Sequence, residues 1–325
     1  MRNPAVVVGT DGTACGTAAV EWAAGEARRR GAPLRIVLAY DWDLHDSRFA
    51  VGSEYADVAR NLAETTVAAA HSRARALEPG IKIETDVLPG YAAPRLLEAS
   101  TGAALLVVGS RGHGGFAGML LGSVGRKMAL QAPCPVVIVR GRTAPAGPVV
   151  AGLDHAGPVV ASHDAAADAG PVVASRDAAA DAGPVVAGLD DSDAMLATAF
   201  EAAAARETGL TVVRAVRPAV PLWLGVPAAA VPLPEDDETE RRQLAAQLAP
   251  WIEKYPRVPV TTVLSHDSAA AALVAASAKA QLVVVGSHGH NNVSGALLGS
   301  TGLQLLHHAH CPVLIDRSVL IDRQA

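Results

Sequence analysis

The sequence predicts an α/β protein built from two tandem domains, each with a parallel sheet flanked by helices. Residues 105–140 agree with residues 282–317 at 19 of 36 aligned positions, and both stretches carry the same glycine spacing. In both halves short apolar strands alternate with helical segments, which implies right-handed crossovers between parallel strands. Apolar residues make up 50% of the chain and aromatic residues only 3%. Val, Leu, Ile and Ala must therefore build the core, as in strands buried on both faces by Ala-rich helices.

The first half contains five expected strands that alternate with four expected helices. The strands are residues 5–11, 34–40, 81–88, the apolar run from 105 that precedes the first glycine motif, and 135–140. The helices are residues 15–30, 54–77 and 92–101, and a helix opened by Ser123.

The second half repeats this order of elements. The expected strands are residues 184–190, 210–216, 258–264, the apolar run from 282 that precedes the second glycine motif, and 312–317. The expected helices are a segment that ends near residue 208, residues 235–254 and 268–280, and a helix after the second glycine motif.

Between the halves, one candidate first strand occurs in four near-copies. The segment AGPVVAGLDH is followed by two 13-residue units that differ only at His163 and Arg176, and then by AGPVVAGLDDSDA. Only the last copy, ending at Asp190, leads through Ser192 into a capped helix. We therefore assign that copy to the sheet and the other three to a linker, with extra edge strands as the alternative. The predicted division is 1–142 for the first domain, 143–182 for the linker, 183–317 for the second domain and 318–325 for a tail.

The glycine motif follows a buried strand in each half and has the spacing expected of a phosphate-binding loop. It consists of Gly109, Gly112, Gly122 and Ser123 in the first half and of Gly286, Gly289, Gly299 and Ser300 in the second. Glycine lets the backbone approach a phosphate and take positive φ, and the following helix offers free N–H groups and the positive end of its dipole. Each serine hydroxyl is expected either to cap that helix or to bind a phosphate oxygen. The alternative is a glycine-rich turn that only joins strand to helix.

The distribution of charge favours an anionic ligand. No carboxylate occurs within residues 99–153 or 268–315, as a polyphosphate site requires. The first interval contains several arginines and the second only Lys279 and histidines, so the first site is expected to be the stronger. No Gly-Lys pair occurs, which excludes a Walker A loop. The G-x-G-x-x-A spacing from Gly112 lacks the acidic residue that a nicotinamide site needs.

Composition argues against several other classes of function. The net charge is −5 without a basic stripe, which argues against nucleic acid as a partner. No window approaches the roughly 18 uncharged apolar residues of a membrane helix, and residues 1–12 are too short for the core of a signal peptide. Cys134 and Cys311 precede the last strand of each half, where buried thiols are expected rather than a disulfide. We expect a cytoplasmic protein without a membrane partner and without a metal-ligand motif.

With these motifs the chain resembles a tandem member of the universal stress protein family, in its ATP-binding branch. The resemblance lies in G-x-x-G-x(9)-G-S in both halves, in VVVGTDGT at 6–13 with its counterpart VVAGLDDS at 185–192, and in CPV before each last strand. It implies two flavodoxin-like domains of the adenine nucleotide alpha hydrolase type, each with strand order 3-2-1-4-5. It also implies bound ATP with Mg²⁺ or Mn²⁺ and pairing of the halves through their last strands, and it allows a homodimer. Asp316 stands where the first half has Val139, which places a charge on that pairing edge.

The resemblance gives one set of nucleotide-binding positions in each half. In the first half these are Gly9, Asp11, Ala39, Gly109, Ser110, Arg111, Gly112, His113, Gly122, Ser123 and Val124. In the second half they are Gly188, Asp190, Ala215, Gly286, Ser287, His288, Gly289, His290, Gly299, Ser300 and Thr301. Asp11 would face the adenosine end of the ligand, with capping of the following helix as its alternative role. The sequence assigns no catalytic residue and no metal ligand.

The predicted function is that of a cytosolic, ATP-binding regulator of the stress response. Neither glycine loop has a neighbouring carboxylate to act as general base, so any ATP hydrolysis should be slow. One alternative is a nucleotidyl-transfer or hydrolytic enzyme of the adenine nucleotide alpha hydrolase group. Another is a nucleotide-free interaction module in which both glycine loops are structural.

Overall fold

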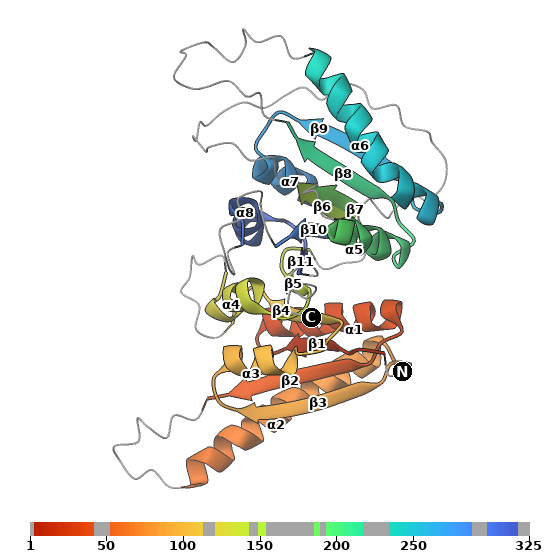
Figure 1. The fold of residues 1–325 in the computed structure, drawn as a ribbon. Helices are drawn as coiled ribbons and strands as arrows, with labels where there is room; N and C mark the ends of the chain where they lie inside the picture. Colours follow the sequence, from red (N-terminus) through yellow and green to blue (C-terminus); the bar gives the residue numbers. More distant parts are fainter. Residues whose placement is uncertain are drawn as a thin grey trace, which may run out of the picture.

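The computed structural model describes residues 3–41, 53–112, 121–142, 149–153, 185–188, 193–216, 234–287 and 298–317. The first half, red to yellow in Figure 1, is a sheet with helices on both faces. Its elements are β1 (Val6–Gly9), α1 (Ala14–Arg30), β2 (Leu34–Tyr40), α2 (Ser53–Leu77), β3 (Ile83–Pro89), α3 (Ala92–Ala99), β4 (Leu105–Gly109), α4 (Ser123–Gln131) and β5 (Val136–Val139).

The sheet of the first half has the strand order β3-β2-β1-β4-β5, which confirms the predicted order. All neighbouring pairs are parallel, and the central strand β1 pairs Val6 with Leu34 on one side and with Leu105 on the other. Alternate residues of a strand point to opposite faces. Val6 therefore shares a core cluster with residues of α1 and α2, while Val7 shares one with residues of α3 and α4. Both faces of the sheet are buried, as the aliphatic composition predicts.

Helix α1 is held at both ends by interactions typical of helix termini. Thr13 Oγ1 accepts a hydrogen bond from the N–H of Gly16, which is an N-cap arrangement. Gly31 follows the last helical residue with φ of 58°, a left-handed conformation that glycine adopts without a Cβ clash. The three arginines of the last turn, residues 28–30, lie at the negative end of the helix dipole. Because the helix start is capped, the short loop between β1 and α1 has a defined position.

The second half, green to blue in Figure 1, repeats the architecture. Parallel pairs join β8 to β9 and β10 to β11. Its elements are β6 (Val149–Leu153), β7 (Val185–Gly188), α5 (Asp193–Ala204), β8 (Leu210–Ala215), α6 (Pro234–Lys254), β9 (Val260–Ser265), α7 (Ala269–Ser277), β10 (Leu282–Gly286), α8 (Ser300–His308) and β11 (Val313–Asp316).

The centre of the second sheet differs from the prediction, because a strand from the predicted linker lies there. β6 belongs to the first of the four near-copies, and it pairs with β10 and with β8. β7, the copy that we assigned to the sheet, pairs with the same residues of β8, so that Val149 and Val185 are both in register with Leu210. A strand has two hydrogen-bonding edges, and β9 takes one edge of β8. β6 and β7, both with the sequence VVAGLD from their first valine onward, are therefore alternatives for the other edge.

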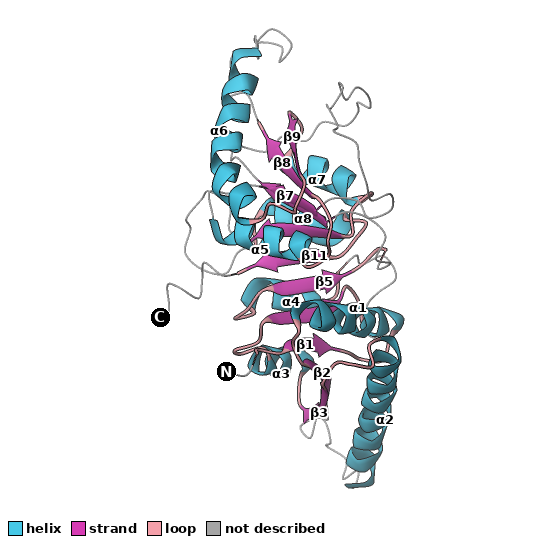
Figure 2. Ribbon diagram, turned by 90° about the vertical axis from the view of Figure 1, so that its right-hand side faces the viewer, coloured by secondary structure: helices cyan, strands magenta, loops and turns pink. Residues whose placement is uncertain are grey.

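The two halves meet along β5 and β11, which run antiparallel and lie side by side in Figure 2. Val313 pairs with Ile138 and Ile315 with Val136, so the two sheets are continuous. Asp316 follows the paired residues and is buried, so its charge lies beyond this ladder and not on it. Gly141, with φ of 59°, follows β5 where an added Cβ would collide with the carbonyl oxygen of His310.

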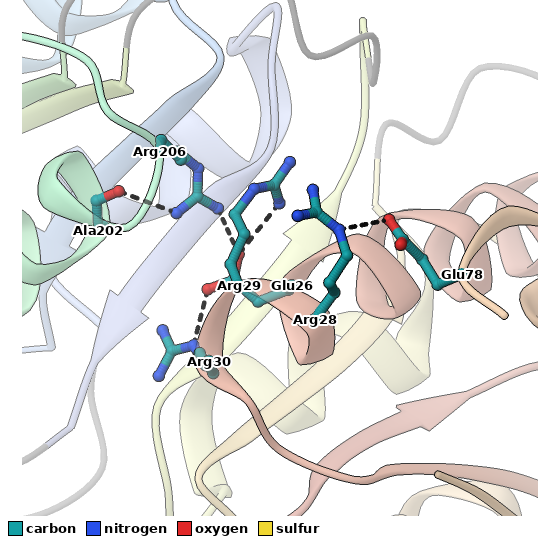
Figure 3. Close-up of polar contacts among 7 residues, drawn as sticks. All are labelled: Glu26, Arg28, Arg29, Arg30, Glu78, Ala202 and Arg206. Carbon is teal, nitrogen blue, oxygen red and sulfur yellow. Dashed lines mark hydrogen bonds and ion pairs between the residues drawn. The ribbon is translucent and has the colours of Figure 1, made fainter. Parts of the chain in front are cut away.

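A buried ion cluster around Glu26 of α1 forms a second contact between the halves (Figure 3). Arg206, just beyond α5, donates to Glu26 Oε2 at 2.6 Å, and both side chains are almost fully buried. Arg30 donates to Oε1 at 2.7 Å, and Arg29 Nη1 lies 3.4 Å from Oε2. Burial alone would raise the pKa of Glu26, but the charges of these three arginines and the hydrogen bond from Arg30 together lower it to about 2. The cluster fixes the C-terminal ends of α1 and α5 against each other.

Candidate functional site

The loops that follow β1 and β4 lie together at one edge of the first sheet. β1 and β4 are parallel neighbours, so the loop 10–13 and the start of the glycine loop, 110–112, leave the sheet at the same edge. Ligands of open α/β sheets bind at this edge, beyond the carboxyl ends of the strands. The start of α4 is tied to the same place, because the N–H of Gly122 donates to the carbonyl of Ser110 at 2.8 Å.

The carboxylate of Asp11 is held by the residue that caps α1. Its Oδ1 accepts hydrogen bonds from the N–H of Thr13 at 3.0 Å and from Thr13 Oγ1 at 2.6 Å. The N-cap itself is Thr13, whose hydroxyl oxygen accepts from Gly16. The alternative in which Asp11 caps the helix is therefore wrong, and Asp11 instead orients the residue that does so.

Gly112 brings the glycine loop into contact with Asp11. A Cβ built on Gly112 would lie 2.5 Å from Asp11 Oδ2, much closer than a carbon and an oxygen can approach. A Cβ on Gly109 would lie 2.7 Å from the carbonyl oxygen of Cys15, so this glycine too is required by close approach. Neither glycine has a positive φ. The sequence predicted glycine here for close approach and for positive φ. At these two positions only close approach is confirmed.

The N-terminus of α4 has no side-chain cap. The capping position is Gly122, with no side-chain hydrogen bond to the helix, and Ser123 is the first helical residue and is exposed. The second half repeats this arrangement with Gly299 and Ser300 at the start of α8. Of the two roles predicted for these serines, capping is therefore wrong, and phosphate binding stays a prediction. Neither capping glycine supplies a side-chain hydrogen bond to its helix, and a helix start without such a cap is suited to an anion.

The charge of this site differs from the sequence expectation in one respect. The interval around the glycine motif has no carboxylate, but the fold brings one in from a distant position, because Asp11 lies against Gly112. Arg111 is exposed on the same loop. A carboxylate repels phosphate oxygens but suits a hydroxyl group or a divalent cation, and Mg²⁺ is commonly bound by one or two carboxylates together with phosphates. The site therefore offers an anion position at α4 and a separate position for a hydroxyl or a cation at Asp11.

The other predicted positions of the first half divide between core and edge. Gly9 is buried, and a Cβ there would lie 2.9 Å from the methyl groups of Leu96, so Gly9 serves the packing of α3 on the sheet. Ala39 lies at the carboxyl end of β2 and is partly exposed, in register with Leu88 of β3. Val124 lies in the first turn of α4 and is partly buried. His113 lies outside the described residues.

In the second half, the described positions occupy equivalent places. Gly188 ends β7, Ala215 ends β8, and Gly286 ends β10. Ser287 and Thr301 are buried, and Gly299 and Ser300 lie at the start of α8. Asp190, His288, Gly289 and His290 lie outside the described residues, so the contact between Asp11 and Gly112 has no described counterpart here.

A cavity of about 620 Å³ lies beside Asp11 and was not expected from the sequence. It is lined by the loop after β1, by α1 and by one side of α2, with Thr66 and Arg73 among the polar residues. Thr66 also packs against Gly12, whose Cβ would lie 2.7 Å from the threonine methyl group. No local motif marks these residues of α2, because they are brought to Asp11 only by helix packing.

Other kinds of site find little support in the part of the chain that the structure describes. Within these residues no group of three or more His, Cys, Asp or Glu is placed to hold a metal ion. None of the described helices combines the length and the apolar character that crossing a bilayer requires. Cys134 and Cys311 are free and buried, and burial raises the pKa of each thiol to about 12, so neither is poised as a thiolate.

Comparison with known protein families gives one match that covers both halves. The model of the universal stress protein family matches residues 3–140 and 183–317. A universal stress protein of Mycobacterium tuberculosis strain H37Rv is 32% identical over 328 residues, which cover 97% of this chain and 98% of the relative. A second one from the same strain is 32% identical over 326 residues, covering 97% of each chain.

One solved structure that spans both halves agrees with the fold. A universal stress protein from Archaeoglobus fulgidus superimposes with a TM-score of 0.61 at 16% identity, over 96% of this chain and 98% of that one. A shorter universal stress protein, solved in complex with cAMP, is 34% identical over 42% of this chain and 97% of its own, with a TM-score of 0.34.

Proposed function

The chain belongs to the universal stress protein family, and from this premise we propose that its first half binds an adenine nucleotide, ATP with Mg²⁺ or Mn²⁺, between the loops after β1 and β4. The observation that carries the proposal is the contact of Gly112 with Asp11, beside the start of α4. This contact admits no side chain at position 112 and brings the Asp11 carboxylate against the glycine loop, beside the start of α4.

The residues present fit such a ligand. The first N–H groups of α4 have no side-chain cap and suit the phosphates, with Arg111 exposed on the same loop. Asp11 Oδ2 suits either the ribose hydroxyls or the divalent cation that phosphates carry with them. The cavity between the loop after β1, α1 and α2 adds about 620 Å³ of space next to Asp11. The phosphates of the nucleotide would carry the negative charge that the start of α4 and Arg111 attract.

We further propose that nucleotide binding makes the protein a regulator of the stress response in the cytoplasm. In this proposal two nucleotide-binding domains, residues 1–142 and 183–317, work as a pair joined through β5 and β11. Support comes from the antiparallel pairing of these strands and from the buried ion pair between Glu26 and Arg206. Two contacts of this kind let a change at one site reach the other half.

An enzymatic role is the second candidate, and one observation favours it. Asp11 places a carboxylate next to the glycine loop, although the sequence around the loop has none. Oδ1 of Asp11, however, accepts two hydrogen bonds from Thr13, so the carboxylate is held in place as an acceptor. We therefore propose at most slow hydrolysis, and a turnover above about 1 per second would instead support an enzyme.

Isothermal titration of the purified full-length chain with ATP and Mg²⁺ tests the proposal, with cAMP titrated in parallel. Saturable heat with ATP is expected. Gly112→Leu should remove binding in the first half, because the new side chain must occupy the place next to Asp11 Oδ2. If cAMP binds and ATP does not, the site takes a different adenine nucleotide, and the ATP proposal is wrong.

Gly80→Leu is the matched control. Gly80 has no positive φ and nothing within 4 Å of an added Cβ, so the same substitution should leave the affinity unchanged. The absence of heat with every nucleotide at millimolar concentration, in a protein that unfolds cooperatively, would support the nucleotide-free interaction module instead.

A further inference from the structure

Two arginines at equivalent places in the two halves reach across the junction in opposite directions. Arg140 follows β5 and Arg317 follows β11, and they align with each other in the repeated sequence. Arg140 donates from Nη1 to the carbonyl of Leu305 at 2.8 Å and from Nη2 to that of His307 at 2.7 Å. Both carbonyls belong to the last turn of α8, in the other half of the molecule.

Arg317 makes the reciprocal contact. Its Nη1 donates to the carbonyl of Ala129 at 2.7 Å, and this carbonyl lies in the last turn of α4 in the first half. The arginine is buried, with 5% of its surface exposed. Each half therefore sends an arginine from the end of its last strand to the C-terminal end of the other half's helix.

Both receiving helices begin at a glycine motif. α4 starts after Gly122 and α8 after Gly299, and neither start has a side-chain cap. The two ends of each helix thus have different partners: the N-terminal end faces the candidate phosphate position of its own half, and the C-terminal end faces an arginine from the other half. A helix of this length is only about 14 Å long, so a shift at one end moves the other.

The contact is of the kind that positions a helix. The last carbonyls of a helix have no intrahelical partner, and a cation at that end is favoured by the dipole. Both arginines depend on these carbonyls, because Nε of each is buried and has no hydrogen-bond partner among the described residues. Burial lowers the pKa of both guanidinium groups, which nevertheless stay charged because the normal pKa of arginine is so high.

We propose that Arg140 and Arg317 are positioning residues for nucleotide binding in the opposite half, each holding the phosphate-facing helix of the other domain. The inference rests on the proposed function and adds to it a cross-connection between the sites. Arg317 serves the first-half site through α4, and Arg140 serves the second-half site through α8. Because Arg140 makes two carbonyl contacts and Arg317 one, the larger effect is expected for Arg140.

Single-site proteins measure the two effects separately. Ser300→Glu places a carboxylate at the exposed start of α8 and should block the second site, while Ser123→Glu should do the same at α4 in the first. In the full-length Ser300→Glu protein, Arg317→Met should weaken ATP binding at the first site about threefold. In the Ser123→Glu protein, Arg140→Met should weaken binding at the second site about tenfold. Arg140→Met in the Ser300→Glu protein and Arg317→Met in the Ser123→Glu protein should leave the affinity unchanged. In these combinations the substituted arginine lies in the same half as the site that is measured, and not in the opposite half.

Arg142 supplies a matched control. It also donates across the junction, to the carbonyl of Ala278, but this residue follows α7 and not a helix that starts at a glycine motif. Arg142→Met should therefore alter neither affinity. Arg→Lys at positions 140 and 317 keeps the charge and should restore part of the lost binding, which a purely steric role would not allow.

Hydrogen exchange of the nucleotide-free protein separates failure of this inference from failure of the proposed function. Arg317→Met should speed exchange in the first turns of α4 and leave α8 unchanged, and Arg140→Met should do the reverse. This pattern without any nucleotide binding would overturn the proposed function while keeping the helix-positioning role. Equal changes in both helices, changes confined to the arginine's own half, or no change at all would overturn the inference.

Discussion

The two halves of the molecule share a glycine motif and a last strand but differ in how firmly the sequence specifies their central strand. In the first half, β1 pairs with β2 and β4, and no other described strand pairs with the same residues of both. In the second half, β6 and β7 have the same sequence and the same partner, Leu210. The difference shows that a duplicated domain can keep its glycine motif while two identical segments become alternatives for its central strand. It also predicts that equivalent substitutions have unequal effects in the two halves.

The largest expected effect is a difference in stability between substitutions at two equivalent valines. Val6 and Val185 are both fully buried and pair with Leu34 and Leu210 respectively. Val6→Asp should lower the free energy of unfolding by about 4 kcal/mol or more, because an unpaired charge is buried. Val185→Asp should cost about 1 kcal/mol or less, within the range of a mild substitution, because β6 fills the same place. Urea unfolding followed by circular dichroism measures both.

Deleting residues 149–184 provides the control for this comparison, since it joins AGP directly to the last VVAGLDD. In the shortened chain Val185→Asp should become as costly as Val6→Asp. If it is equally costly in the full-length chain, β6 and β7 are not interchangeable.

The second prediction concerns how strongly the halves depend on each other. Arg206→Met leaves Glu26 buried without its partner from the other half. It should lower the free energy of unfolding, measured in urea, by about 3 kcal/mol, because breaking a buried ion pair leaves a buried charge unpaired. Combining Glu26→Met with Arg206→Met should recover most of the loss, since a buried ion pair is replaced by apolar side chains. A double variant as unstable as Arg206→Met would show that the cluster acts by more than charge pairing.

The third prediction follows from the pKa of Glu26, which folding lowers from 4.5 to about 2. The stabilisation from this group is complete above pH 4.5 and is lost as the pH falls toward 2, by about 3 kcal/mol in total. The groups that face it are Arg206, Arg29 and Arg30, which stay charged over this range. The difference in unfolding free energy between the natural protein and Glu26→Gln should shrink over this pH interval. A difference that is independent of pH would contradict the assignment.

The smallest effect compares the two acidic residues after the central strands. Asp11→Ala should weaken ATP binding about tenfold at the first site, as loss of one charged contact does. Asp190→Ala should weaken the second site about threefold or less, because Asp154 follows β6 as Asp190 follows β7. Calorimetry on the Ser300→Glu and Ser123→Glu proteins makes both measurements. Equal losses would indicate that only β7 serves the second site.

The fold of the first half was predictable because its strands are short apolar runs between strong helix signals. Its strand order is the predicted one. The choice between β6 and β7 was not predictable, since identical segments carry no information about which of them occupies the sheet. The helix start at Ser123 was located correctly, but its cap was not, because Gly122 takes the capping position without a side chain.

The contacts between distant segments had no local signal. Asp11 reaches the glycine loop only because β1 and β4 are neighbours. Arg140 counted only as one of the cations near the first glycine motif, and the sequence predicted no role for Arg317 or Glu26. Their roles depend on the antiparallel junction of the halves, which no spacing within one segment encodes.

The antiparallel junction of the halves determines from which side each proposed site is reached. β4 is parallel to β5 and β10 to β11, whereas β5 and β11 are antiparallel, so the carboxyl ends of β4 and β10 point to opposite edges of the continuous sheet. If each half binds a nucleotide as proposed, the two nucleotides enter from opposite edges of the sheet. A ligand with two adenosines joined by a short phosphate chain could then fill one site but could not bridge both.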